Sequence, residues 1–158
     1  MNTEFNYKWI VWYHYDKDNW NASGFKQLYK INNIADLWKL YNNFQLIGGV
    51  TNKHLFIMKE GVLPVWEDPN NINGGCWSFK ILEDHSAELW EDLSVALVCN
   101  KITSNDDIMG LSICLKKNSN VVVKIWNKSS NNSSLKLLNN SILEKWGTDI
   151  IYIAHMSK

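Results

Sequence analysis

Three segments of the chain place apolar residues every three or four positions, the spacing of an amphipathic helix. The first covers residues 34–44 and follows Asn33, a residue type that often caps helices. The second runs from residue 87 to about 99 with Ser86 as its expected cap, and the third covers residues 135–146. The pattern therefore predicts three helices, spread along the whole chain.

Seven other segments are short, apolar or alternating, and bounded by polar turns, which is typical of β-strands. Several consecutive pairs are joined by only a few polar residues, and such connections favour antiparallel pairing. The expected strands are residues 9–15, 25–31, 55–58, 76–82, 108–115, 121–126 and 150–154.

This mixture of elements indicates an α+β fold, a mainly antiparallel sheet with three helices on one face. The uncovered face would then be free to carry a ligand. Neither an internal repeat nor an interdomain linker interrupts the pattern. We expect one domain over residues 1–158, with a short N-terminal segment over residues 1–6.

The charge balance excludes some partners. Sixteen basic residues, all of them lysine, match sixteen acidic residues in a chain of 158 residues. A neutral chain without arginine is poorly suited to duplex DNA, which requires clustered positive charge. The apolar runs are far shorter than the roughly 20 residues of a membrane span, so we expect neither DNA nor a membrane as a partner.

The three cysteines, Cys76, Cys99 and Cys114, fit neither a disulfide framework nor a zinc motif. No secretory leader opens the chain, and a reducing, cytoplasmic compartment is the simplest expectation. The sequence also lacks a nucleophile motif, a phosphate-binding loop and a metal-ligand set. We therefore expect a monomeric, non-enzymatic protein without a cofactor.

Tryptophan is the unusual component, with nine residues in the chain. Most are expected in the core, but Trp20 and Trp66 lie in polar, loop-like segments where burial is not expected. Glu67 and Asp68 directly follow the second of them. Two indoles and a carboxylate suit guanine, whose N–H and amino group form a paired donor edge. Spacing alone leaves open whether the two rings meet.

Several motifs extend this pattern along nearly the whole chain. They are W-x-x-W at Trp9 and Trp12, DLWKLYNNFQL around Trp38, PVWED at Trp66, GGCW ending at Trp77, Trp90, and VVVKIW ending at Trp126. In order and spacing the chain resembles the eukaryotic translation initiation factor 4E family, the messenger-RNA cap-binding proteins. The resemblance implies a curved antiparallel sheet backed by three helices on its convex face, with the cap on the concave face.

The resemblance also implies roles for individual residues. Trp20 and Trp66 match the two rings that stack on 7-methylguanine, and Glu67 matches the carboxylate that binds the guanine edge. Trp126 matches the ring that contacts the methyl group. Methylation makes the base cationic, and a cation between indoles gains cation–π attraction of about 0.5–2 kcal/mol per contact.

The phosphate contacts depart from the family pattern. Cys76 occupies the position of a basic residue, and a second basic residue matches either Lys116 or Lys117. A third position falls near Val122, where Lys124 shares the strand face and could substitute. Lysine lacks the planar guanidinium group of arginine, which can bind a phosphate with two hydrogen bonds. We therefore expect weaker binding of the triphosphate and a binding affinity that depends little on salt.

On the helical side, Trp38 matches a residue that binds a peptide from scaffold factor 4G or from repressors, with Ile34 and Val95 as neighbouring contacts. Glu91 replaces an apolar contact, and core packing is the alternative interpretation of Trp38. The short ends of the chain indicate a minimal family member, either divergent or encoded by a virus.

The sequence is compatible with three functions. The first is cap binding in translation initiation or its regulation. The second is a cap-acting hydrolase that uses Glu67 or Asp68, and the third is a protein-interaction module whose cap pocket is degenerate.

Overall fold

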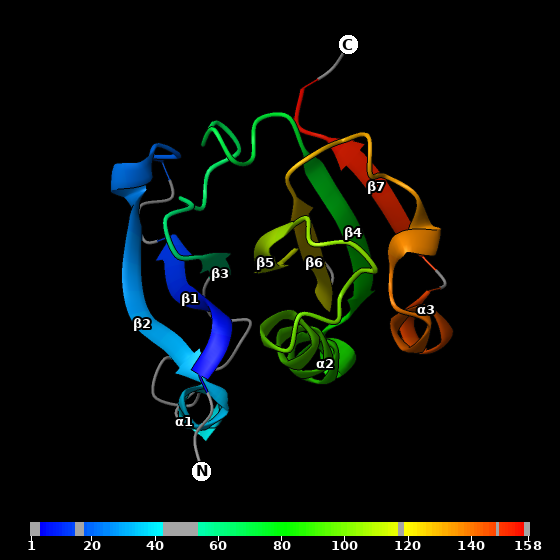
Figure 1. Ribbon diagram of the computed structural model, residues 1–158, viewed down its shortest axis with the longest axis horizontal. Helices are drawn as coiled ribbons and strands as arrows, with labels where there is room; N and C mark the ends of the chain where they lie inside the picture. The colour runs from blue at the N-terminus through cyan, green and yellow to red at the C-terminus, as the bar shows by residue number, and fades with distance from the viewer. Residues whose placement is uncertain (1–3, 15–17, 43–53, 117–118, 148, 157–158) are drawn as a thin grey trace.

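One antiparallel sheet of seven strands organises the molecule (Figure 1). The computed structural model of the protein describes residues 4–14, 18–42, 54–116, 119–147 and 149–156. The spatial order of the strands is β2-β1-β3-β5-β6-β4-β7, which leaves β2 and β7 at the edges. The strands are β1 (Glu4–His14), β2 (Phe25–Asn33), β3 (His54–Lys59), β4 (Gly75–Leu82), β5 (Ile108–Leu115), β6 (Asn120–Asn127) and β7 (Ile150–Ala154).

The three helices pack on the same face of this curved sheet. They are α1 (Ile34–Asn42), α2 (Ser86–Val98) and α3 (Asn140–Trp146). Leu37 of α1, Leu93 of α2 and Ile142 of α3 all belong to one buried cluster with side chains of the sheet. The predicted α+β architecture, with three helices on one face, is therefore confirmed.

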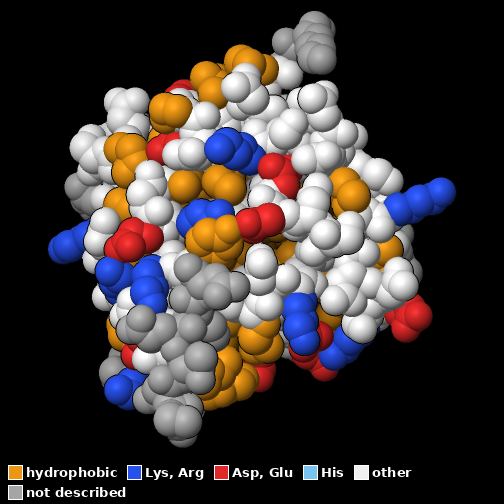
Figure 2. Space-filling model, viewed as in Figure 1, with side chains coloured by type: hydrophobic (Ala, Val, Ile, Leu, Met, Phe, Trp, Pro, Cys, Tyr) orange, Lys and Arg blue, Asp and Glu red, His pale blue; other side chains and the backbone are white. Residues whose placement is uncertain are grey.

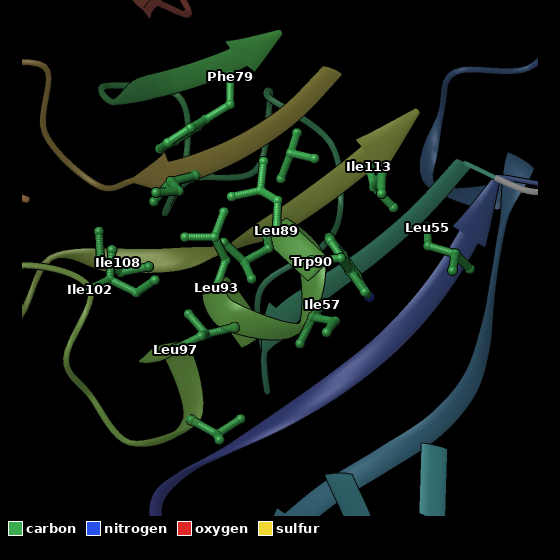
Figure 3. Close-up of a cluster of buried hydrophobic side chains, with 14 of the residues drawn as sticks. Leu55, Ile57, Phe79, Leu89, Trp90, Leu93, Leu97, Ile102, Ile108 and Ile113 are labelled. Carbon is green, nitrogen blue, oxygen red and sulfur yellow. The ribbon is translucent and has the colours of Figure 1, made fainter. Parts of the chain in front are cut away.

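Strand alternation separates the two faces of the sheet. Leu55 and Ile57 of β3 belong to the large buried cluster that also contains the apolar side chains of α2 (Figure 3). Phe56 and Met58 alternate with them along β3 and belong to a smaller cluster with Trp126. This second cluster forms the floor of the concave face, which the helices do not cover.

The helix starts agree only partly with the predicted caps. The Asn33 side chain accepts a hydrogen bond from the backbone N–H of Asp36 (3.0 Å), as expected for a cap of α1. The cap predicted at Ser86 is wrong, because its hydroxyl instead donates to the carbonyl oxygen of Glu83 (2.6 Å). A short 3₁₀ turn, Glu83–His85, leads into α2 in its place.

The third predicted helix is interrupted. Residues Leu135–Leu137 form a 3₁₀ turn, and α3 begins only at Asn140. The Asn139 side chain accepts from the backbone N–H of Ser141 (2.8 Å) and restarts the helix. Apolar spacing could not reveal this break, because asparagine competes with the helix backbone through its own side chain. The last two residues of the first predicted helix lie outside the described residues.

Charged side chains of both signs are interspersed over the visible face of the molecule (Figure 2). This distribution agrees with the equal numbers of lysines and carboxylates in the sequence. Across the part of the chain that the structure describes, no helix has the length and apolar character needed to cross a membrane.

Replacing Leu93, which is fully buried at the centre of α2, tests the core assignment. We expect Leu93→Ala to lower the free energy of unfolding by about 2–5 kcal/mol, because it removes apolar contacts and leaves a cavity. Urea denaturation measures this loss. The control is Leu82→Ala at the exposed end of β4, which should cost less than about 0.5 kcal/mol. Equal costs for the two variants would contradict the packing of α2 on the sheet.

Candidate functional site

A pocket of about 470 Å³ opens on the face of the sheet opposite the helices. Its floor comes from the central strands, and its sides come from the β1–β2 and β3–β4 loops and the end of β7. The lining residues are Trp20, Phe25, His54, Phe56, Pro64, Val65, Trp66, Glu67, Cys76, Ser78, Ser112, Lys124, Trp126, Ile153, Ala154 and His155.

Buried polar side chains hold the β3–β4 loop, which carries Trp66 and Glu67. The Asp68 carboxylate accepts hydrogen bonds from the backbone N–H groups of Leu63 (2.9 Å) and Asn70 (2.8 Å). The Asn71 amide donates to the carbonyl oxygens of Leu63 (3.0 Å) and Val65 (2.9 Å). The loop is thus bound to itself, and Asp68 is used for structure.

The same loop turns its remaining side chains toward solvent. Trp66 is 45% exposed, and Glu67 beside it is exposed as well. Among the described residues, neither the Glu67 carboxylate nor the Trp66 backbone N–H has a hydrogen-bond partner. An indole face, a carboxylate and a backbone donor are therefore available side by side at the pocket.

Trp20 reaches the pocket from the other loop. The side chain is 56% exposed and its ring stacks on the His14 imidazole, with centroids 3.8 Å apart and planes 24° apart. The Asn19 side chain fixes the turn by accepting from the Asn21 backbone N–H (2.9 Å) and donating to the Ser23 hydroxyl (2.9 Å). Local polar contacts therefore hold a large apolar ring in a solvent-facing position.

Trp126 forms part of the pocket floor and is only 7% exposed. Its indole N–H donates to the Ser112 hydroxyl on the neighbouring strand β5 (3.0 Å). The centroid of the Phe56 ring lies 6.1 Å away, edge-on to the indole. Trp126 thus presents apolar surface to the pocket while its polar atom is satisfied within the sheet.

Cys76, at the position where the resemblance implies a basic residue, forms a neutral pair with His155. Cys76 Sγ lies 3.3 Å from Nε2 of His155, whose Nδ1 lies 2.8 Å from the carbonyl oxygen of Asn71. A carbonyl oxygen only accepts, so Nδ1 carries the hydrogen and Nε2 accepts from the thiol. Burial raises the pKa of the Cys76 thiol to about 12 and lowers that of the His155 imidazole.

Lys124 supplies the positive charge in the pocket lining. It lies on β6 between Ser78 of β4 and Ser112 of β5, and its side chain is exposed. Lys116 is exposed at the end of β5 but does not line the pocket. Lys117, the alternative to Lys116, lies outside the described residues.

The partner-binding candidates lie on the opposite, helical side. Trp38 of α1 is 41% exposed, and its ring centroid lies 5.7 Å from that of Tyr41. The Tyr41 hydroxyl donates to the Trp90 carbonyl oxygen of α2 (3.1 Å), which connects the two helices. Ile34 and Val95 are half-buried against the core. Val95 lines a groove between α2 and α3 that includes neither Ile34 nor Trp38.

With this geometry in view, the chain can be compared with known proteins. Residues 4–156 match the model of the family described as Eukaryotic initiation factor 4E. The chain belongs to this family. A relative in Triticum aestivum, Eukaryotic translation initiation factor NCBP, is 31% identical over 121 residues, which is 74% of this chain and 51% of that protein. The chain thus spans about half the length of such curated relatives.

Solved structures of the family share the fold. Ascaris suum eIF4E-3 in complex with an m7G cap has a TM-score of 0.82 at 24% identity, covering 100% of this chain and 94% of that one. C. elegans eIF4E-3 in complex with the 4E-binding protein Mextli and a cap analog has a TM-score of 0.83 at 23% identity, covering 98% and 94%.

The sequence did not reveal every pocket residue. His14 and His155 are not among the predicted site residues, yet His155 lines the pocket and His14 lies against Trp20. His54 was not singled out, although it also lines the pocket. Isolated histidines carry no motif, and only the register of β1, β3 and β7 brings them to this face.

The half-buried imidazole of His54 generates a prediction about acid stability. Burial, reinforced by Lys116, His14 and Lys124, lowers the pKa of His54 to about 3. An unfolded chain protonates this group near pH 6.5. The unfolded state therefore gains the proton first, and the free energy of unfolding falls as pH drops from about 6.5 toward 3, by at most about 1.4 kcal/mol per pH unit.

His54→Phe should flatten this slope, measured by urea denaturation at pH 7 and pH 5. The control is His85→Phe, at an exposed site before α2, which should keep the wild-type slope. A slope unchanged by His54→Phe would show that another group causes the acid sensitivity.

Proposed function

We propose that this protein binds the 7-methylguanosine cap of messenger RNA in the pocket between Trp20 and Trp66. The observation that carries the proposal is that two half-exposed indoles, from loops 46 positions apart in the sequence, line one pocket together with an exposed carboxylate. Family membership and the cap complexes of the similar eIF4E-3 structures support the same ligand.

In the proposed complex the base stacks between the two indoles. The Glu67 carboxylate accepts the ring N–H and the amino group of guanine, and the Trp66 backbone N–H donates to the base carbonyl oxygen. Trp126 contacts the 7-methyl group from the pocket floor. Methylation makes the base cationic, so each stacking contact gains cation–π attraction that unmethylated guanine lacks.

The phosphates lie toward the lysines, with Lys124 as the principal contact and Lys116 or Lys117 as a second one. The neutral Cys76–His155 pair contributes no charge where the family uses a basic residue. The base contacts therefore supply most of the affinity, and the phosphates supply less.

The helical side is the proposed partner surface. Exposed Trp38, with Ile34 beside it on α1 and Val95 on α2, would anchor a helical peptide of the scaffold 4G type or of a repressor. The complex of the similar C. elegans eIF4E-3 with Mextli supports such a partner. The partner bound there would decide whether translation is promoted or blocked.

We further propose that the protein acts as a monomer in the cytoplasm and does not turn the cap over. Among the described residues, no three His, Cys, Asp or Glu side chains come together to hold a metal ion. Asp68, the second carboxylate of the hydrolase hypothesis, is buried and engaged by backbone N–H groups. Glu67 would then lack a second carboxylate for acid–base chemistry in the pocket.

Removing either ring or the carboxylate tests the base site. Trp20→Ala should weaken 7-methyl-GTP binding by about 5- to 150-fold, the range of a lost base–aromatic stack of ~1–3 kcal/mol. Glu67→Ala should weaken it comparably, because the donor edge of guanine loses its acceptor. Isothermal titration calorimetry measures both, with GTP as the unmethylated ligand.

The matched control is Trp38→Ala, which removes another exposed indole, on the helical side, and should leave cap affinity unchanged. Cap binding that survives both Trp20→Ala and Glu67→Ala would refute the site. Failure of the wild type to bind would favour the degenerate interaction module. Release of 7-methyl-GMP from a cap analogue in magnesium buffer would favour the hydrolase.

Replacing Lys124 tests the phosphate contacts separately. Lys124→Ala should weaken 7-methyl-GTP binding by about 3- to 10-fold, as for one partly solvated charge contact, and reduce its salt dependence. Binding of 7-methylguanosine, which has no phosphate, should not change. Lys136→Ala, an exposed lysine outside the pocket lining, is the control. An equal loss for both ligands would place Lys124 at the base instead.

A further inference from the structure

His14 packs against Trp20 but does not line the pocket. The two ring centroids are 3.8 Å apart with the planes nearly parallel. Trp20, Phe25 and His54 all line the pocket, whereas His14 does not. The imidazole therefore covers the indole face that is turned away from the pocket, and the opposite face remains for a ligand.

The surroundings of His14 hold this imidazole in place. Its Nε2 lies 2.7 Å from the carbonyl oxygen of Asn19, which only accepts, so Nε2 carries a hydrogen. The Phe25 ring centroid lies 4.7 Å away, and that of His54 lies 6.3 Å away, edge-on. Nδ1 is consequently the ring nitrogen that carries no hydrogen in the neutral imidazole.

We propose that His14 is a positioning and specificity-determining residue, which braces Trp20 and favours a cationic base only while its own imidazole is neutral. The inference rests on the proposed cap-binding function. A ligand cation on one face of the indole is attracted to the π electrons. A second cation on the other face of the same ring competes for them and repels the first.

Other charged groups near His14 do not offset this effect. His54, on β3, stays neutral because burial depresses its pKa to about 3. Phe25 on β2 is apolar, and Asn19 contributes a neutral carbonyl. Lys116 and Lys124, which help to lower the pKa of His54, are cations themselves. Among the groups that these contacts identify, none is an acid that would neutralise a protonated His14.

The pH dependence of cap binding follows from this arrangement. The affinity for 7-methyl-GTP should therefore fall on acidification by about 2- to 10-fold, as for like charges separated by two stacking distances in a partly solvated site. GTP, whose base is uncharged, should not show this His14-dependent loss.

The test compares variants that differ only at this ring. Calorimetric affinities for 7-methyl-GTP and GTP are measured at pH 7.5, 6.5 and 5.5 for the wild type, His14→Phe and His14→Ala. His14→Phe keeps a flat ring without charge and suits a neighbourhood that already contains Phe25 and Phe56. It should match the wild type at pH 7.5 and bind about 2- to 10-fold better at pH 5.5.

His14→Ala removes the brace, and we expect weaker 7-methyl-GTP binding at every pH. Any pH effect that arises elsewhere in the pocket is common to all variants and cancels in the comparison. His85→Phe, which replaces an exposed histidine outside the pocket lining, should keep the wild-type pH profile. Thermal melting verifies that each variant is folded.

Identical pH profiles for the wild type and His14→Phe would overturn the inference, even with tight cap binding at pH 7.5. Wild-type affinity in folded His14→Ala would overturn the bracing role. Absence of 7-methyl-GTP binding by the wild type at pH 7.5 would be a different failure, because it would refute the proposed function together with everything that rests on it.

Discussion

The alternation of side chains across one antiparallel sheet is the constraint on which the rest of the structure depends. Along β3, Leu55 and Ile57 are buried in the cluster that the helices cover, while Phe56 and Met58 face the other way. Because all three helices cover one side, the core is complete without the concave face. That face can therefore carry a pocket whose floor is sheet and whose walls are loops.

Polar side chains inside the loops make this pocket possible. Exposed indoles at Trp20 and Trp66 forgo apolar burial, so the backbone around them must be held by other interactions. The Asp68 carboxylate and the Asn71 amide bind the second loop internally, and Asn19 does the same in the first. The many asparagines of this chain thus have a structural use at the site, since asparagine suits tight turns.

Most of the fold was predictable from the sequence, because hydrophobic periodicity reports directly which residues face the core. Six of the strands and the second helix lie within two residues of the predicted ends, and the first helix starts where it was predicted. The first strand begins at Glu4, five residues before its predicted start. The break at Asn139 was not predictable, since it depends on one side-chain hydrogen bond inside a continuous apolar pattern. The same holds for Ser86, whose hydroxyl found a different acceptor.

The candidate site was predictable only in part. Trp20, Trp66 and Glu67 were conspicuous because large rings beside a carboxylate are unusual in polar loops, and the structure brings them to one pocket with Trp126. The sequence could not identify His14, His54 and His155 as residues at the site, because the register of the strands, and not sequence spacing, brings them there. Lys116 shows the converse, since its charge is evident in the sequence but it does not reach the pocket lining.

The contacts of His155 affect the entropy of ligand binding. Its backbone N–H donates to the Gly74 carbonyl oxygen (2.9 Å), and its ring meets both Asn71 and Cys76. The loop that presents Trp66 is thereby fastened at its far end to the end of β7, besides its internal hydrogen bonds. A wall that is already ordered before the ligand arrives loses little conformational freedom on association. Loss of the His155 contacts would make the loop that carries Trp66 more flexible while the sheet stays folded. The affinity for the ligand would then fall without a comparable loss in the free energy of unfolding.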